Sequence, residues 1–409
     1  MTRPKAESHF NDSPLNFVGS KKVLRSRDGI ALMLIGIAAL FFQSKNSGSP
    51  QLATSPQSWP FFRANPRRTG SNGGQGLSQL SGVRWQFKTG GPVHGSPSIL
   101  ENLAVIGSTD GRVYALNLKT GLELWHVAVQ DEYAACTPAL FERWVLFAAL
   151  DQRLHAVDLE TGVEKWVAHT GNFVSSSSPL ITDGKVLIGS NSGKLHAFDL
   201  LTGKSLWTAQ TDHVIASSPA AEGGNVYVGS ADGFLYSFRE DTGKENWKFE
   251  TEGPVLSTPL IFEKNVYVVS EDNRVYAVRI ATGKAKWKTR LAQEKYQGPP
   301  IVSQLSSSPC MWDEALYVGS TDERLYAVGV EFGQVKWKFK TGGKILSSPA
   351  AAGGLVYFGS DDGFLYALEA SSGIVKWRFD AESPIRSSPA VQDGVVIFGT
   401  DQGTVYALE

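Results

Sequence analysis

The stretch Val255–Trp287, VLSTPLIFEKNVYVVSEDNRVYAVRIATGKAKW, decides the fold because its pattern returns along most of the chain. The recurring phrases are Ser-Ser-Pro, an apolar run ending in Gly-Ser, Asp-Gly, Leu-Tyr-Ala-Leu and Thr-Gly before a tryptophan. Eight tryptophans mark this repeat: Trp85, Trp125, Trp166, Trp207, Trp247, Trp287, Trp337 and Trp377. Their intervals are 40, 41, 41, 40, 40, 50 and 40 residues. A period of this length with several short strands per unit predicts a propeller or a solenoid.

Four antiparallel strands are expected within this unit. Residues 255–261 form the first strand, and residues 265–270, rich in β-branched and aromatic side chains, form the second. Residues 274–278 alternate as a third strand, and Trp287 lies on a fourth. Asp-Gly pairs at the corresponding bend of other units, such as Asp110-Gly111, favour two-residue hairpin turns. Four such strands make one blade of a β-propeller.

The number of units and the two ends of the repeat predict a closed ring. Eight units begin with a strand containing Ser-Pro or Thr-Pro, at Pro97, Pro138, Pro179, Pro219, Pro259, Pro309, Pro349 and Pro389. The last unit ends at residues 404–408 without a fourth strand, whereas residues 84–88 stand alone before the first unit. Pairing these two segments removes the open edges of a linear array. We therefore predict an all-β, eight-bladed β-propeller of four-stranded antiparallel blades over residues 59–409, with the tryptophans buried between blades.

The N-terminal segment has the pattern of an export signal. A basic leader, residues 1–28, precedes an apolar segment at 29–43, which we expect to be a helix. This segment is short for a membrane span, but no clear Ala-x-Ala cleavage site follows it. We favour an uncleaved signal-anchor, with a cleaved signal peptide as the alternative. Residues 44–58 are then a flexible linker. The propeller is predicted on the periplasmic or extracellular side of the membrane, or secreted if the segment is cleaved.

Composition and charge narrow the class of partner. The chain of 409 residues is 42% hydrophobic and 19% charged, with a formal net charge of −1. This composition is typical of a globular protein and gives no reason to expect nucleic acid as a partner. The two cysteines, Cys136 and Cys310, are too few for a disulfide framework, and we interpret both as small buried residues rather than reactive thiols.

The repeat also resembles a known family. The run AVDLETGVEKW at residues 156–166 resembles the tryptophan-docking motif A-x-D-x-x-T-G-x-x-x-W of the pyrroloquinoline-quinone (PQQ) repeat, and residues 115–125 and 197–207 match almost as well. Looser copies occur at residues 237–247, 277–287, 327–337 and 367–377. The stretch from Trp59-Pro60 to Thr69-Gly70 resembles the lead-in segment common before such propellers.

The resemblance implies one of two functions. Quinoprotein dehydrogenases of this superfamily line the quinone pocket with adjacent cysteines and hold calcium with acidic and amide side chains, whereas Cys136 and Cys310 do not adjoin. The closer likeness is to the non-enzymatic branch that includes the outer-membrane assembly factor BamB, a lipoprotein; this chain lacks the lipid-accepting cysteine. We therefore expect a membrane-tethered, non-catalytic scaffold that binds an envelope protein and needs no cofactor. The alternatives are a dehydrogenase using PQQ and calcium, or a sensor that binds a small ligand.

Two irregularities in the repeat are candidate contact sites. Trp287 to Pro309 spans 22 residues against 12 from Trp247 to Pro259, so the connection at 290–304 is an insertion, in which Tyr296 and Gln297 are the first candidates. A tolerated surface insertion without a role is the alternative.

The second irregularity is the variable position three residues before each repeat proline. His94 and Arg386 occupy it in blades that become neighbours when the ring closes. They would form a small basic spot for an anion or an acidic partner group, or else be solvated residues lining the central channel. No catalytic set and no metal-ligand spacing is found in the sequence.

Overall fold

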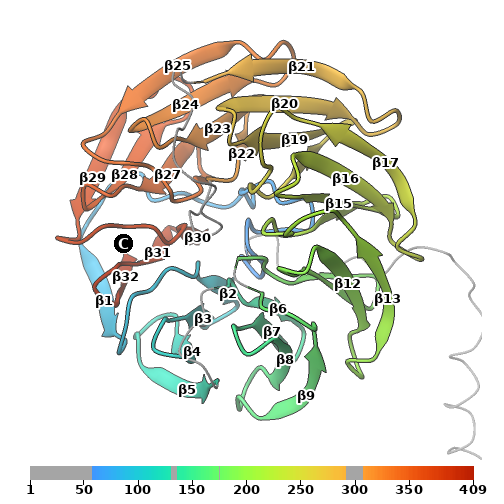
Figure 1. Cartoon of the computed structure of the whole chain (residues 1–409). Coiled ribbons are helices and arrows are strands. Elements are labelled where there is room, and N and C mark those ends of the chain that lie inside the picture. Colours follow the sequence, from blue (N-terminus) through green and yellow to red (C-terminus); the bar gives the residue numbers. More distant parts are fainter. Residues whose placement is uncertain (1–57, 130–135, 175, 292–306) are drawn as a thin grey trace, which may run out of the picture. The chain divides into compact units, whose positions relative to one another are not determined.

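The computed structural model describes residues 58–129, 136–174, 176–291 and 307–409, which belong to one compact unit. They form eight four-stranded antiparallel sheets arranged as blades around a central axis (Figure 1), so the predicted eight-bladed propeller is confirmed. The apolar segment predicted as a helix at 29–43 and most of the linker lie outside the described residues. In the described ranges, no helix has the length and apolar character needed to cross a membrane.

Blades 1 to 7 follow the chain in groups of four strands, and the innermost strand of each blade comes first. These first strands, with that of blade 8, are β2 (Ser98–Leu100), β6 (Ala139–Phe141), β10 (Leu180–Thr182), β14 (Ala220–Glu222), β18 (Leu260–Phe262), β22 (Cys310–Trp312), β26 (Ala350–Ala352) and β30 (Ala390–Gln392). The second strands are β3 (Leu103–Gly107), β7 (Trp144–Ala148), β11 (Lys185–Gly189), β15 (Asn225–Gly229), β19 (Asn265–Ser270), β23 (Ala315–Gly319), β27 (Leu355–Gly359) and β31 (Val395–Gly399).

The outer half of each blade is longer. The third strands are β4 (Arg112–Asn117), β8 (Arg153–Asp158), β12 (Lys194–Asp199), β16 (Phe234–Arg239), β20 (Arg274–Arg279), β24 (Arg324–Gly329), β28 (Phe364–Glu369) and β32 (Thr404–Leu408). The fourth strands are β5 (Glu123–Ala128), β9 (Glu164–His169), β13 (Ser205–Gln210), β17 (Glu245–Glu250), β21 (Ala285–Arg290), β25 (Val335–Lys340), β29 (Val375–Asp380) and, for blade 8, β1 (Val83–Lys88).

Ring closure follows the sequence prediction. Strand β1 pairs antiparallel with β32, with Trp85 opposite Ala407 and Phe87 opposite Val405. The tryptophan of each blade donates its indole N–H to a backbone carbonyl of the next blade, as Trp207 does to Glu240 at 3.0 Å. Trp377 of blade 7 donates instead to the carbonyl of Leu77, at 2.7 Å. Blade 8 is therefore completed by two parts of the N-terminal segment: Leu77 supplies the carbonyl that accepts the tryptophan N–H, and β1 supplies the fourth strand.

The Ser-Pro phrase forms a second closed circle around the axis. The backbone N–H of the residue before each proline donates to the hydroxyl of the equivalent residue in the next blade, at 2.8–3.2 Å. The chain of donors and acceptors is Ser96, Thr137, Ser178, Ser218, Thr258, Ser308, Ser348, Ser388 and again Ser96. These hydroxyls satisfy buried amides that no strand partner reaches, which explains why each blade needs Ser or Thr there.

This circle also corrects the predicted first strand. Residues 255–261 were expected to form it, but β18 begins only at Leu260. Proline at 259 has no N–H to donate, and Ser257 uses its side chain instead, donating to the carbonyl of Val269 at 2.7 Å and accepting from its N–H at 2.9 Å. The residues before the proline are therefore held by hydroxyl groups rather than by a backbone ladder.

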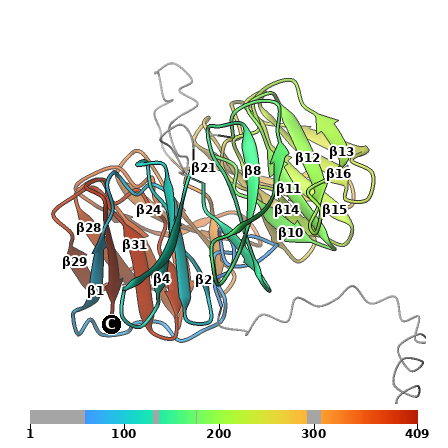
Figure 2. The same ribbon diagram turned by 90° about the horizontal axis from the view of Figure 1, so that it is seen from below.

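The lead-in segment, residues 59–75, covers one end of the ring. Its backbone carbonyls accept N–H groups of the inner strands, for example Pro60 from Leu140 and Pro66 from Ala221. In Figure 1 this segment, in blue, crosses the centre of the ring, and Figure 2 shows it towards one end. We call this end the lead-in face. The opposite end, which carries the turns between second and third strands and the loops entering each blade, is the loop face.

Two arginines of the lead-in segment are almost completely buried. The Arg68 side chain is 1% exposed and donates to the carbonyls of Phe62, Pro179 and Pro219 at 2.5, 3.1 and 2.9 Å. Arg63 donates to the carbonyls of Pro309 and Pro349. Burial, followed by the charge of Arg63, lowers the pKa of Arg68 to about 9. Each guanidinium group thus joins carbonyls from two adjacent blades: Arg68 those of blades 3 and 4, and Arg63 those of blades 6 and 7.

Candidate functional site

The structure brings the two basic candidates of the sequence analysis together on the loop face. His94 lies in the loop between β1 and β2, and Arg386 lies in the loop between β29 and β30. Both contact Asp401, in the turn between β31 and β32: His94 Nε2 is 3.2 Å from Oδ1, and Arg386 Nη1 is 3.3 Å from Oδ2. Arg386 Nε also donates to Asp361 Oδ1 at 3.1 Å, from the turn between β27 and β28. Adjacent blades 7, 8 and 1 therefore share one polar cluster.

The charge of this cluster differs from that of the expected basic spot. One arginine and two aspartates sum to −1 when His94 is neutral (+1 − 2). Although partial burial lowers the pKa of Arg386, its hydrogen bond to Asp361 and the charges of Asp401 and Asp361 raise this pKa overall. Arg386 therefore carries a permanent positive charge that is already paired with Asp361 and Asp401. An anionic ligand would have to compete with these two carboxylates. Binding of an anion or acidic group here stays a prediction.

One acceptor in the cluster lacks a hydrogen bond. His94 Nε2 lies 3.2 Å from Asp401 Oδ1, yet this buried oxygen accepts no hydrogen bond from the described residues. The side chains of His94, Asp361 and Asp401 are about one-fifth exposed, at 20, 20 and 21%. The cluster can thus accept a hydrogen bond from a partner as well as offer a guanidinium group, which suits recognition of polar groups rather than bond chemistry.

The sequence analysis missed both aspartates. They follow the Ser or Thr that starts the turn after each second strand, where other blades carry Thr109, Ala231, Glu271 or Thr321. Variation at this position, set beside the variable position of His94 and Arg386, was the signal that could have found them. The other candidates, Tyr296 and Gln297, lie outside the described residues, so their role also stays a prediction.

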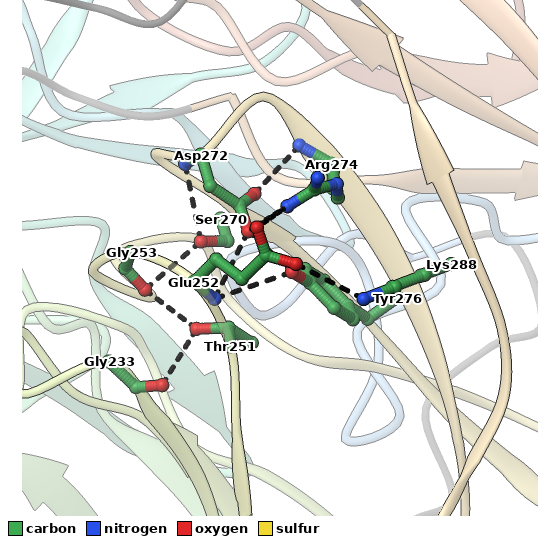
Figure 3. A network of polar contacts seen from close by, with 9 residues as sticks. All are labelled: Gly233, Thr251, Glu252, Gly253, Ser270, Asp272, Arg274, Tyr276 and Lys288. Atoms are coloured by element: carbon green, nitrogen blue, oxygen red, sulfur yellow. Dashed lines mark hydrogen bonds and ion pairs between the residues drawn. The ribbon is translucent and has the colours of Figure 1, made fainter.

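A larger polar network in blade 5 shows what most turn aspartates do (Figure 3). Asp272 is buried and accepts from the N–H groups of Arg274 at 2.9 Å and Glu252 at 3.2 Å, and from the hydroxyl of Tyr276. Burial, followed by this hydrogen bond, raises the pKa of Tyr276 to about 12. Thr251 joins the same loop to the carbonyl of Gly233 in blade 4, at 2.7 Å. These groups fasten the connection between two blades and need no ligand.

The two cysteines lie in the interior of the described part of the chain. Cys136 and Cys310 are both free and buried, as interpreted from the sequence, and burial raises the pKa values of their thiols to about 12 and about 11. Cys136 takes the place of the hydroxyl in its blade, since its thiol contacts the backbone of Ala148 at 2.8 and 3.1 Å. Among the described residues no group of three or more His, Cys, Asp or Glu side chains is placed to hold a metal ion.

These features define a class, the propellers built of PQQ-like repeats. The model of the family described as outer membrane protein assembly factor BamB matches residues 75–214, 196–343 and 333–409. The chain therefore belongs to this family. Among curated protein sequences no match to the chain is found.

Solved structures similar to this one come from both branches of the fold. BamB from Moraxella catarrhalis aligns with a TM-score of 0.67 at 18% identity, covering 80% of this chain and 97% of its own. A quinohemoprotein alcohol dehydrogenase from Pseudomonas putida HK5 aligns with a TM-score of 0.76 at 15% identity, covering 87% of this chain and 80% of its own. A europium-containing methanol dehydrogenase aligns with a TM-score of 0.74 at 15% identity, covering 87% and 99%. At these identities the likeness shows the shared fold alone.

Proposed function

We propose that this protein is a non-catalytic binding propeller of the cell envelope, tethered to the membrane by its N-terminal segment, that contacts a protein partner through its loop face. The observation that carries the proposal is the asymmetry of the ring. The lead-in segment occupies one end, whereas the loop face presents the cluster around Arg386 and Asp401. Membership of the BamB family supports a binding role.

The chemistry of the loop face also supports binding over catalysis. Asp401 carries a buried oxygen without a hydrogen-bond donor, and Arg386 is 37% exposed in its side chain. A partner that offers a hydrogen-bond donor beside a carboxylate would satisfy both groups in one contact. Polar and charged groups arranged in this way give specificity and orientation to an interface.

Site-specific photo-crosslinking in cells tests the proposal. A photoreactive residue at Lys344, exposed on the loop face, should capture a defined envelope protein, and the double substitution Arg386→Ala with Asp401→Asn should reduce that capture at least fivefold. The same residue at Lys284, exposed in the turn between β20 and β21 at the opposite end, serves as the control. Equal products from both positions, or capture unaffected by the double substitution, would refute a loop-face partner. Mass spectrometry of the mature N-terminus tests the tether directly.

Quinone-dependent oxidation is the second candidate function, because the same ring is found in the alcohol and methanol dehydrogenases. Purified protein would be mixed with PQQ and calcium chloride, and the quinone absorbance and reduction of an electron-accepting dye would be followed with simple alcohols. We expect neither a spectral shift nor dye reduction. A saturable shift accompanied by turnover would make this protein an enzyme.

A further inference from the structure

The residue whose carbonyl accepts the tryptophan N–H directly after a third strand is acidic in one of the seven blades that supply such a residue. The residue that follows the third strand, whose carbonyl accepts the tryptophan N–H of the preceding blade, is apolar in blades 1 to 3 and 5 to 7: Leu118, Leu159, Leu200, Ile280, Val330 and Ala370. In blade 4 it is Glu240. A carboxylate thus stands where six other blades place an apolar side chain. In blade 8 the residue after the third strand is the exposed Glu409, and the tryptophan N–H of blade 7 goes to Leu77 instead.

The burial of Glu240 is costly and incompletely compensated. The residue is 7% exposed, and its Oε1 atom has no hydrogen-bond partner in the part of the chain that the structure describes. Burial raises the pKa of Glu240, while hydrogen bonding to Thr182 and the charge of Lys185 act in the opposite direction. A buried carboxylate is expensive unless it is paired and fully hydrogen-bonded. The propeller fold does not need this cost, since an alkyl group serves in the equivalent position of six blades.

Glu240 lines a polar groove between blades 3 and 4. The groove has a volume of about 480 Å³ and opens at the turns that lie on the lead-in side of the ring. Its other charged side chains are already paired: Lys185 with Asp183 at 2.9 Å, and Arg239 with Asp241 at 2.5 Å. Three carboxylates and two cations sum to −1 (−3 + 2), and the uncompensated charge belongs to Glu240.

An equivalent groove lies between blades 6 and 7, so the groove is a feature of the repeat, whereas the buried carboxylate is particular to blade 4. That groove, about 560 Å³, is lined by Gly353 and Gly354 in the places of Gly223 and Gly224, and by Ala370 in the place of Glu240. Ser78 and Gln79 from the chain's own N-terminal part form one of its walls. Of these two grooves, the one between blades 3 and 4 is lined by a buried acid, whereas the other has alanine in its place.

We propose that the groove between blades 3 and 4 binds a primary ammonium group, with Glu240 as its counter-ion. A single unpartnered oxygen matches a compact point donor such as an ammonium, whereas a guanidinium fork requires two parallel acceptors. A divalent cation would need several further oxygen ligands, and among the described residues no group of three acidic or His/Cys side chains converges. The ammonium belongs either to a lysine side chain of a partner protein or to a free diamine. This site does not depend on the loop-face partner proposed above.

The ring tryptophans supply a local reporter for the test. The indole N–H of Trp207 donates to the Glu240 carbonyl, so its resonance in the spectrum of ¹⁵N-labelled protein lies beside the site, while the indole signals of distant blades are internal references. The signal would be assigned with Trp207→Phe. Titrations would use cadaverine, the peptide acetyl-Gly-Lys-Gly-amide and the matched peptide with arginine. Glu240→Gln tests the charge, and Glu240→Leu installs the residue of blades 1 to 3.

We expect cadaverine and the lysine peptide to shift the Trp207 signal in a saturable way, and both substitutions at Glu240 to weaken this binding at least tenfold. The indole signals of the variants report that the ring is intact. Tighter binding of the lysine peptide identifies a partner side chain as the source, and equal or tighter binding of cadaverine identifies a free amine. No saturable shift in the wild-type protein, an unchanged shift in Glu240→Leu, or preference for the arginine peptide would overturn the proposal.

Discussion

Replacing Arg68 by methionine should destabilise the propeller far more than the same change one residue earlier. Arg68 donates to the carbonyls of Phe62, Pro179 and Pro219, and the substitution leaves all three without this donor. Each buried acceptor left unsatisfied costs roughly 1–3 kcal/mol. Methionine also removes a buried cation. The folded state then no longer carries the desolvation cost of that charge, which offsets part of the loss.

The net effect should resemble that of breaking a buried charged contact, about 3–5 kcal/mol. For a propeller of about 350 residues, an unfolding entropy near 2.1 cal/mol/K per residue gives about 0.7 kcal/mol per kelvin. The melting temperature should therefore fall by about 4–7 °C. Urea unfolding at 25 °C, followed by circular dichroism, would measure the change in the free energy of unfolding, and calorimetry would measure the change in Tm.

The control is Arg67→Met. The Arg67 side chain is 58% exposed and forms a 2.7 Å ion pair with Glu222, so its replacement should cost about 1 kcal/mol or less. If both substitutions change the free energy of unfolding equally, the guanidinium of Arg68 does not hold the blades together, and the account of the lead-in segment is wrong.

Four further predictions concern packing, hydrogen bonding and titration. Gly203→Ala should destabilise the fold by at least about 1 kcal/mol more than Gly184→Ala. Both glycines have positive φ (68° and 70°), but only a Cβ at residue 203 would meet Trp166, at 2.5 Å. Urea unfolding of the two variants isolates that contact, and equal losses of stability would contradict the prediction. Thr258→Val removes the hydroxyl that accepts the Ser218 N–H at 3.0 Å and should cost about 1–3 kcal/mol by the same measurement, whereas a neutral result would show that the hydroxyl circle is dispensable. Burial, followed by the charge of Lys194, lowers the pKa of His196 to about 4, so the unfolded chain binds the proton first as pH falls. The free energy of unfolding should therefore drop by about 2 kcal/mol between pH 7 and 5. His196→Tyr, which installs the residue found at this place in blade 4, should flatten that part of the pH profile. The raised pKa of Glu240, on which Lys185, Asp183 and Asp241 also act, has the opposite sign: stability falls as pH rises from the unfolded value of 4.5 through the folded one, so Glu240→Leu should be more stable than wild type at pH 7 and should lose that advantage below pH 4.

The sequence analysis located the strands well where the repeat was regular. Blade number, the pairing of β1 with β32 and the tryptophan contacts all follow from a pattern that is repeated eight times, so each copy corroborates the others. It was wrong about the length of the first strand in the unit from Val255 to Trp287, because Ser257 uses its hydroxyl group where a backbone ladder was expected. That choice depends on an amide in the neighbouring blade, which no single unit reveals.

The candidate site was less predictable. The sequence analysis placed His94 and Arg386 in adjacent blades correctly, because the pairing of β1 with β32 makes blades 1 and 8 neighbours. Their shared partner Asp401 was missed, since it comes from a different turn and reaches them only when the loop face is assembled. In the sequence, nothing distinguishes Glu240 from the charged residues beside it, Arg239 and Asp241. Its isolation is visible only once blade 3 covers it.

By itself the sequence determined the architecture, because a blade is a local structure whose strands, turns and inter-blade tryptophan recur at a constant spacing. Only the tertiary structure decided what the unrepeated residues do. Arg63 and Arg68 link the lead-in segment to pairs of adjacent blades, Asp401 contacts two basic side chains, and the Glu240 Oε1 atom has no hydrogen-bond partner among the described residues. The physical reason is that burial and ion pairing depend on which surfaces meet when the ring closes, and a residue that occurs once carries no period from which those neighbours could be inferred.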